Sequence, residues 1–214
     1  MMKASTRVSA SATSTMKTGT LLGIGAYSLW GLFPLYWKQL ASVPAVQVLA
    51  HRIMWSFLCT SIALLFFPKA RSELAALFRS PNRLFAIAAA GVLISVNWGI
   101  YIWAINASRI VESSMGYYLN PLVSVLLGAL IFKEKIDRGM ILAGFIALCG
   151  IMILIVSYGR LPWVALSLAF SFALYGAIKK LAGLSGLAGL AAETSVVAPF
   201  ALAYTLVLGA HGSG

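Results

Sequence analysis

Residues 91–134 read GVLISVNWGIYIWAINASRIVESSMGYYLNPLVSVLLGALIFKE, and they decide the fold. The stretch consists of two apolar runs joined by a short polar turn. Each run holds about 20 residues, and at 1.5 Å per residue this is enough to cross a hydrocarbon core about 30 Å thick. We therefore expect two transmembrane helices that form a hairpin.

Polar side chains gather on one side of each arm of this hairpin. On a helical wheel Asn97 and Tyr101 share a side of the first arm. One side of the second arm carries Ser113, Tyr117, Asn120, Pro121, Ser124 and Gly128. A polar group in hydrocarbon is unfavourable unless it is paired, so these sides are expected to face protein or water.

The composition excludes a water-soluble globule. The 214 residues are 61% hydrophobic and 10% charged, and the mean hydropathy is +0.93. A membrane protein satisfies its backbone with helices or a closed barrel, and continuously apolar runs favour helices. Despite a net charge of +11, the basic residues sit in turns, which favours a lipid bilayer over nucleic acid as partner. Cys59 and Cys149 lie in apolar runs, so we predict neither a metal site nor a disulfide framework, and we expect no cofactor.

The apolar runs predict an all-α membrane protein with seven transmembrane helices. We place them at 19–37, 45–67, 84–106, 113–132, 139–158, 161–178 and 189–210. Residues 1–18 are rich in Ser, Thr and Ala with three basic residues, a composition that predicts a disordered cytoplasmic tail. Residues 211–214 form the carboxyl end.

The basic residues orient these spans. Of the 16 Lys and Arg residues, twelve lie in the tail and in the second, fourth and sixth turns. The opposite turns hold three, Lys38, Arg109 and Arg160, and Arg52 lies inside the second span. Because Lys and Arg accumulate on the cytoplasmic side, we predict a cytoplasmic amino terminus.

The chain contains a short internal repeat. Residues 26–31, AYSLWG, and 171–176, SFALYG, share a pattern of small, aromatic and glycine positions 145 residues apart. Five predicted spans separate the copies, and an odd number inverts the second copy across the membrane, as in many secondary transporters. We predict a first repeat of five helices over 19–158 and an incomplete second repeat over 161–210.

Prolines and asparagines inside the spans each allow two interpretations. Pro34 and Pro121 free backbone carbonyls, and the resulting kinks either line a substrate path or are tolerated by packing. Asn97 and Asn120 either contact a polar substrate or form interhelical hydrogen bonds. Asn106 is expected to cap a helix.

Charged residues inside or near the spans are also open to two interpretations. His51 and Arg52 lie about 10 Å into the second span by helical rise. Arg52 either binds an anionic group or couples to a proton, or it extends outward to water. Glu112 and Glu193 either carry a proton or interact favourably with the dipole at a helix amino terminus.

Six segments together resemble one family. They are AYSLWGLFPLYWK, HRIMWS, NWGIYIWAIN, ESSMGYYLNPLVSVLLG, LAFSFALYGAIKK and the Glu193-Thr194 pair. These segments are similar to RarD-type proteins, linked by name to chloramphenicol sensitivity, of the EamA family in the drug/metabolite transporter superfamily. The resemblance implies a multi-pass permease of the bacterial inner membrane, with roughly ten helices in two inverted repeats. Such a permease moves small organic solutes by alternating access.

The wheel and the resemblance together define a candidate substrate path. It comprises Trp30, Pro34, His51, Arg52, Trp55, Asn97, Trp98, Tyr101, Glu112, Tyr117, Asn120 and Pro121. The expected partners are a small-molecule substrate and lipid, and a homodimer is left open as a further partner. About three closing helices of the family are missing, so we expect a truncated chain. The alternative function is a non-transporting scaffold or a half-transporter that dimerises.

Other functional classes fit poorly. The sequence contains no HExxH or GxSxG motif and no aspartate inside a predicted span, which argues against an intramembrane enzyme. A retinal protein would need a lysine in its last span, and residues 189–210 contain none.

Overall fold

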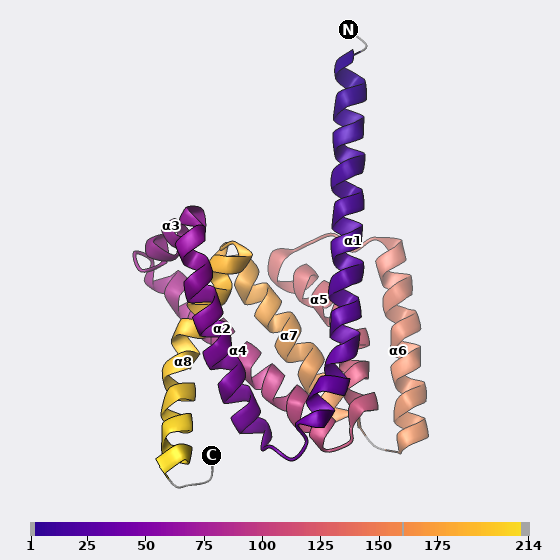
Figure 1. Cartoon of the computed structure of the whole chain (residues 1–214). Coiled ribbons are helices and arrows are strands. Elements are labelled where there is room, and N and C mark those ends of the chain that lie inside the picture. The colour runs from indigo at the N-terminus through magenta and orange to yellow at the C-terminus, as the bar shows by residue number, and fades with distance from the viewer. Residues whose placement is uncertain (1–2, 160, 211–214) are drawn as a thin grey trace. The chain divides into compact units, whose positions relative to one another are not determined.

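The computed structural model describes residues 3–159 and 161–210, and within these ranges it is helical and contains no strand (Figure 1). The helices are α1 (Lys3–Gln39), α2 (Ala45–Phe66), α3 (Pro68–Leu77), α4 (Pro81–Asn106), α5 (Ile110–Phe132), α6 (Arg138–Tyr158), α7 (Trp163–Ala182) and α8 (Gly186–Ala210). Six of them, α2 and α4 to α8, are long and apolar enough to cross a membrane. Arg160 and residues 211–214, which entered the predictions above, lie outside the described ranges.

Helix α1 belongs to a compact unit of its own, residues 1–40. The structure differs here from the predicted disordered tail over 1–18, because the helix begins at Lys3. No proline or glycine occurs between Lys3 and Gly19, so the sequence offers no residue that would end the helix. Helix α1 contains the predicted first span but is not among the six apolar helices, so the seventh span stays a prediction.

The bounds of the other spans agree closely with the predictions, with two differences. The second turn contains a short helix, α3, which starts with Pro68 in its first turn and is made largely of strong helix formers. Helix α7 continues past the predicted end at residue 178 to Ala182, and Gly183 follows with a positive φ of 60°. Lys179 and Lys180 therefore lie in the last turn of a helix.

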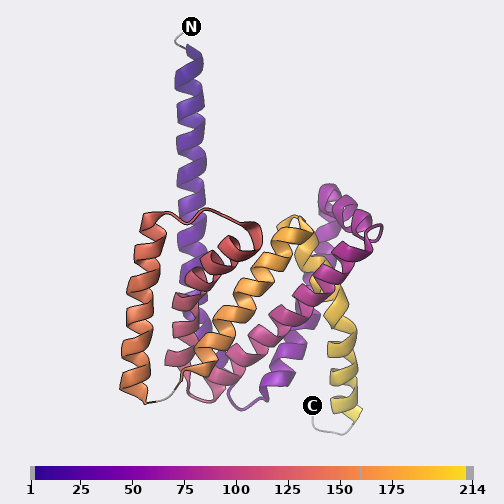
Figure 2. The same cartoon turned by 180° about the vertical axis from the view of Figure 1, so that it is seen from behind.

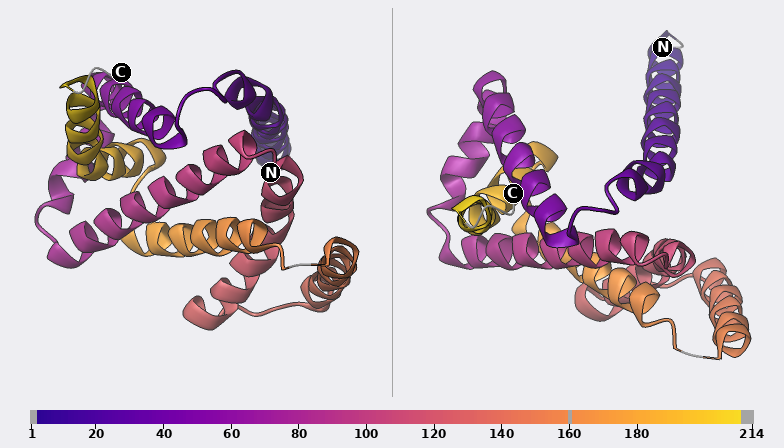
Figure 3. Two further views of the ribbon diagram at one scale, coloured as in Figure 1. Left: turned by 90° about the horizontal axis from the view of Figure 1, so that it is seen from below. Right: turned by 60° about the horizontal axis from the view of Figure 1, so that its bottom comes forward.

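Within residues 41–214, α7 packs against both α4 and α5, and α2 packs against α8 (Figures 2 and 3). Small residues permit the close approach of α5 and α7. Their shared core consists of Met115, Leu119, Val123, Ala165, Ala169 and Ala173. Alanines at every fourth position of α7 line this contact, as is typical of helix packing in membranes.

Helices α4 and α8 approach each other closely at Gly91. A Cβ atom added to Gly91 would lie 2.9 Å from the backbone oxygen of Glu193, closer than side chains are normally found. Gly91 is itself buried. The absence of a side chain at this position therefore lets the backbones of two spans come into contact.

Two charged side chains fix the turn between α7 and α8. Arg83, near the start of α4, donates from Nε and Nη2 to the carbonyl oxygen of Ala182 at 2.9 and 2.7 Å. The carboxylate of Glu73 in α3 accepts a hydrogen bond of 2.8 Å from the backbone N–H of Ser185. Hydrogen bonding from Ser185 lowers the pKa of Glu73 below its ordinary value.

Candidate functional site

The guanidinium of Arg52 in α2 stacks on the indole ring of Trp98 in α4. Its Cζ lies 3.3 Å from the ring centroid, which is a close cation–π contact. Arg52 is half-buried although it lies inside an apolar helix. The structure thus places one of the predicted path cations against one of the predicted path aromatics.

Two tyrosines extend this contact toward α5. The rings of Trp98 and Tyr101 meet edge to face at 5.5 Å, and those of Tyr101 and Tyr117 at 5.7 Å. Tyr101 is buried, whereas Tyr117 is 44% exposed. We call Arg52, Trp98, Tyr101 and Tyr117 the Arg52 cluster; its members come from three helices.

Asn97 lies next to this cluster in sequence but points to α7. Its Nδ2 donates to the carbonyl oxygen of Leu168 at 2.9 Å and to the hydroxyl of Ser171 at 2.8 Å. The side chain is buried. Of the two interpretations that the sequence left open, the structure has the interhelical hydrogen bond, and a path role for Asn97 stays a prediction.

Asn120 and Pro121 follow Tyr117 by about one helical turn. Asn120 is half-buried, and its Oδ1 accepts from the hydroxyl of Ser124 at 3.4 Å. Pro121 is exposed within the uninterrupted helix α5. Both residues therefore continue the polar side of α5 on which Tyr117 lies.

Several predicted path residues lie outside the Arg52 cluster. His51 and Trp55 are exposed on α2. Trp30 and Pro34 belong to α1, where the rings of Tyr27 and Trp30 meet edge to face at 5.5 Å. For these four residues a role in the path stays a prediction.

Glu112 forms a bidentate ion pair with Arg109 at the turn between α4 and α5. Arg109 Nη2 lies 2.9 Å from both carboxylate oxygens, and its Nε donates to Oε1 at 3.0 Å. The Arg109 guanidinium also lies 5.7 and 5.0 Å from the ring centroids of Trp103 and Trp163. Glu112, in the first turn of α5, therefore has a neighbouring cation as well as the helix dipole.

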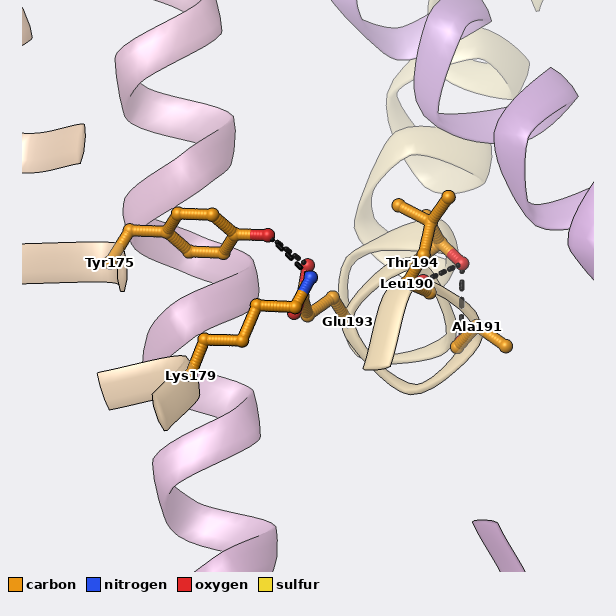
Figure 4. Close-up of polar contacts among 6 residues, drawn as sticks. All are labelled: Tyr175, Lys179, Leu190, Ala191, Glu193 and Thr194. Atoms are coloured by element: carbon orange, nitrogen blue, oxygen red, sulfur yellow. Dashed lines mark hydrogen bonds and ion pairs between the residues drawn. The ribbon is translucent and has the colours of Figure 1, made fainter. Parts of the chain in front are cut away.

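A second polar cluster joins α7 to α8 (Figure 4). Lys179 Nζ lies 3.1 Å from Glu193 Oε1 and donates to the hydroxyl of Tyr175 at 2.7 Å. The Tyr175 hydroxyl in turn donates to Glu193 Oε2 at 3.1 Å. Glu193 is 1% exposed, so its carboxylate depends on these two partners.

Sequence reasoning missed this cluster because it placed Lys179 in a turn. The available signal was the spacing of Tyr175 and Lys179, four residues apart and so on one face of a helix that reaches Gly183. Thr194, next to Glu193, donates its hydroxyl to the carbonyl oxygens of Leu190 and Ala191 at 2.8 and 3.1 Å (Figure 4).

Six helices that are long and apolar enough to cross a membrane define a multi-pass membrane protein, and they carry a guanidinium stacked on an indole ring and an ion pair with a buried carboxylate. The model of the EamA-like transporter family matches residues 17–156. The chain belongs to the EamA-like transporter family and is of the RarD type.

Curated relatives cover most of this chain. It is 46% identical over 196 residues to Protein RarD of Streptomyces exfoliatus, covering 92% of this chain and 62% of the relative. It is 46% identical over 196 residues to the uncharacterized transporter YojE of Bacillus subtilis, a match that covers 90% of this chain and 65% of the relative. It is 38% identical over 192 residues to Protein RarD of Escherichia coli, a match that covers 90% of this chain and 64% of the relative. The chain thus spans less than two thirds of the length of these relatives, and no solved structure matches it.

Proposed function

We propose that this chain is part of a bacterial inner-membrane permease that moves small organic solutes, drugs or metabolites, by alternating access. The observation that carries the proposal is the Arg52 cluster. Side chains from α2, α4 and α5 bring a cation, an indole and two phenols together inside apolar helices. Polar and charged groups within membrane spans are expensive to bury and commonly mark a solute or ion path.

The names of relatives support a transporter of this kind. YojE of Bacillus subtilis is called a transporter, and a relative from Pseudomonas aeruginosa, 31% identical over 195 residues, is called a chloramphenicol-sensitive protein. Chloramphenicol is therefore a reasonable first solute to test. The distribution of basic residues supports a cytoplasmic amino terminus.

The proposed mechanism is rocking of two helix groups about a central cavity. The proposed cavity is lined by α2, α4, α5 and α7. The pairing of α2 with α8 and the packing of α7 on α4 and α5 suggest the two groups, and α4, which also contacts α2 and α8, joins them. An ion gradient would drive the cycle, as in other secondary transporters.

The test is solute flux in proteoliposomes that contain the purified chain, with chloramphenicol in a panel of radiolabelled solutes. We expect flux or solute preference to change several-fold in Tyr117→Ala and Asn120→Ala. Tyr118→Ala is the matched control, because Tyr118 is the next residue of α5 and is also exposed. Normal transport in both path variants would contradict the cavity assignment. Stable crosslinked dimers without flux would favour the alternative of a scaffold or half-transporter.

A further inference from the structure

Arg52 has no acidic partner in the part of the chain that the structure describes. The sequence contains five acidic residues, and all five lie in described helices or turns. Glu112, Glu134 and Glu193 form ion pairs with other cations, and Glu73 and Asp137 accept backbone N–H groups at helix starts. The guanidinium of Arg52 therefore lies inside a span with no carboxylate beside it.

The stacked guanidinium does not extend toward the nearer helix ends. Arg52 lies seven residues after Ala45, the start of α2, and Trp98 lies eight residues before Asn106, the end of α4. These two ends meet, because Asn106 Nδ2 donates to the carbonyl oxygen of Val43 at 3.4 Å. At 1.5 Å per residue both side chains start about 10 to 12 Å along their helices. Arg52 and Trp98 therefore start at similar levels on the two helices, and the guanidinium lies against the indole ring.

The third helix brings its polar side to the same depth. Tyr117 lies seven residues after Ile110, the start of α5, which is again about 10 Å along the helix. The short α4–α5 turn places this start beside the end of α4. The Tyr101 ring fills the space between Trp98 and Tyr117. Arg52, Trp98 and Tyr117 therefore form one layer across three helices.

Stacking on an indole leaves the hydrogen-bonding capacity of the guanidinium in place. The N–H donors of arginine lie in the plane of the guanidinium, whereas Trp98 covers its face. A planar fork of donors matches a carboxylate or phosphate group, to which arginine binds with two parallel hydrogen bonds. Among the described residues, a cation inside a span that has no carboxylate beside it and lies against an aromatic ring has the chemistry that recognises an anion.

We propose that the Arg52 cluster binds the anionic group, a carboxylate or phosphate, of a transported organic anion. The solute's apolar body would lie against the rings of Trp98, Tyr101 and Tyr117. That the anion is transported rests on the function proposed above, whereas the binding site rests on the geometry of the cluster.

Equilibrium dialysis of the chain in phosphatidylcholine nanodiscs tests the proposal. The probes are radiolabelled benzoate and hexanoate, each compared with its uncharged amide, benzamide or hexanamide. We expect at least one carboxylate to bind about tenfold more tightly than its amide, and Arg52→Gln to abolish that preference. Arg52→Lys should retain part of it, because lysine keeps the charge but loses the fork.

The matched control is Arg79→Gln, which removes an exposed arginine outside the spans and should leave binding unchanged. Equal binding of acid and amide by the unmodified chain would overturn the proposal, as would an unchanged preference in Arg52→Gln. If circular dichroism shows that Arg52→Gln has lost its helicity, Arg52→Lys becomes the deciding variant. Carboxylate binding as tight in Arg52→Lys as in the unmodified chain would contradict recognition by the two parallel hydrogen bonds of the guanidinium.

A lipid headgroup is the other source of the same chemistry. The dialysis is repeated in nanodiscs that contain phosphatidylglycerol, an anionic lipid. If this lipid displaces the carboxylate from the unmodified chain, Arg52 binds a lipid headgroup and the proposed substrate class is wrong. If binding of the carboxylate is unchanged, the proposed organic anion is supported. Flux without any preference for anions would support transport and refute the anion site. Binding that depends on Arg52, without flux, would support the anion site and refute transport by this chain.

Discussion

Lys179 Nζ lies 3.1 Å from Glu193 Oε1, and this ion pair joins α7 to α8 inside a stretch of apolar helix. The carboxylate has almost no exposed surface, and Tyr175 holds its other oxygen. A buried pair of this kind adds little net stability when it is intact, but removing one partner leaves a buried charge uncompensated.

We therefore expect Lys179→Met to lower the free energy of unfolding by about 3 to 5 kcal/mol. The double variant with Glu193→Gln should recover part of this loss, because it removes the stranded charge. The measurement is unfolding in mixed micelles by increasing sodium dodecyl sulfate, applied to both single variants and to the double variant.

The neighbouring lysine supplies the control for this cycle. Lys180 pairs with Glu134, but both side chains of that pair are more than half exposed, at 58% and 52%. Lys180→Met should therefore change the free energy of unfolding by about 1 kcal/mol or less. Equal effects of the two lysine variants, or strict additivity of the Lys179 and Glu193 substitutions, would refute the buried pair.

The contact of α4 with α8 predicts that Gly91→Ala is destabilising. The added methyl group would approach the backbone oxygen of Glu193 at 2.9 Å, and backbone cannot rotate away as a side chain can. We expect a loss of about 1 to 3 kcal/mol, which is typical of overpacking. Gly99→Ala in the same helix is the control, since its nearest neighbour is the flexible Leu49 side chain at 3.4 Å. Thermal unfolding in which Gly91→Ala matched Gly99→Ala would rule out the close approach.

Glu73 predicts a defined pH dependence of stability. Because hydrogen bonding from Ser185 lowers its pKa in the folded state, its contribution is complete above the unfolded pKa, about 4.3. The contribution is lost as the pH falls through the lower folded pKa. The melting temperature of the unmodified chain should thus exceed that of Glu73→Gln at pH 7, and the difference should shrink below about pH 4. A difference that stays constant or grows on acidification would be inconsistent with this bond.

The proposed orientation predicts where reporter enzymes are active. Alkaline phosphatase folds and works outside the cytoplasm, so a fusion after Gly159, at the end of α6, should be active. A fusion after Gly183, at the end of α7, should be inactive, because the basic residues assign that turn to the cytoplasm. An inactive fusion after Gly159 together with an active fusion after Gly183 would show that the chain has the opposite orientation in the membrane.

Much of the fold could be predicted from the sequence because continuous apolar runs determine membrane spans. The bounds of α2 and α6 agree with their predicted spans to within one residue at each end. Helix α3 was missed because its ten residues are too short and too polar to register as a span. The start of α1 was missed because its composition resembles that of a disordered tail.

The candidate site was less predictable because it depends on contacts between helices. The wheel placed Asn97 and Tyr101 on one side, but the structure directs Asn97 to α7 and Tyr101 to α5. The stacking of Arg52 on Trp98 depends on how α2 and α4 pack against each other, and the periodicity of a single helix does not predict that packing. Lys179 was assigned to a turn because the apolar run of this span ends about one helical turn before α7 itself ends at Ala182.

The most direct test of the account is the water accessibility of Tyr117→Cys. Cys59 and Cys149 are exposed, so both are first replaced by serine. Ile146→Cys, at an exposed apolar position near the middle of α6, is the lipid-facing control. A water-filled path along the polar side of α5 predicts that a membrane-impermeant thiol reagent labels position 117 and leaves position 146 unlabelled in intact membranes. Protection of position 117 from that reagent, together with labelling by a lipid-soluble maleimide, would contradict a solute path lined by the Arg52 cluster.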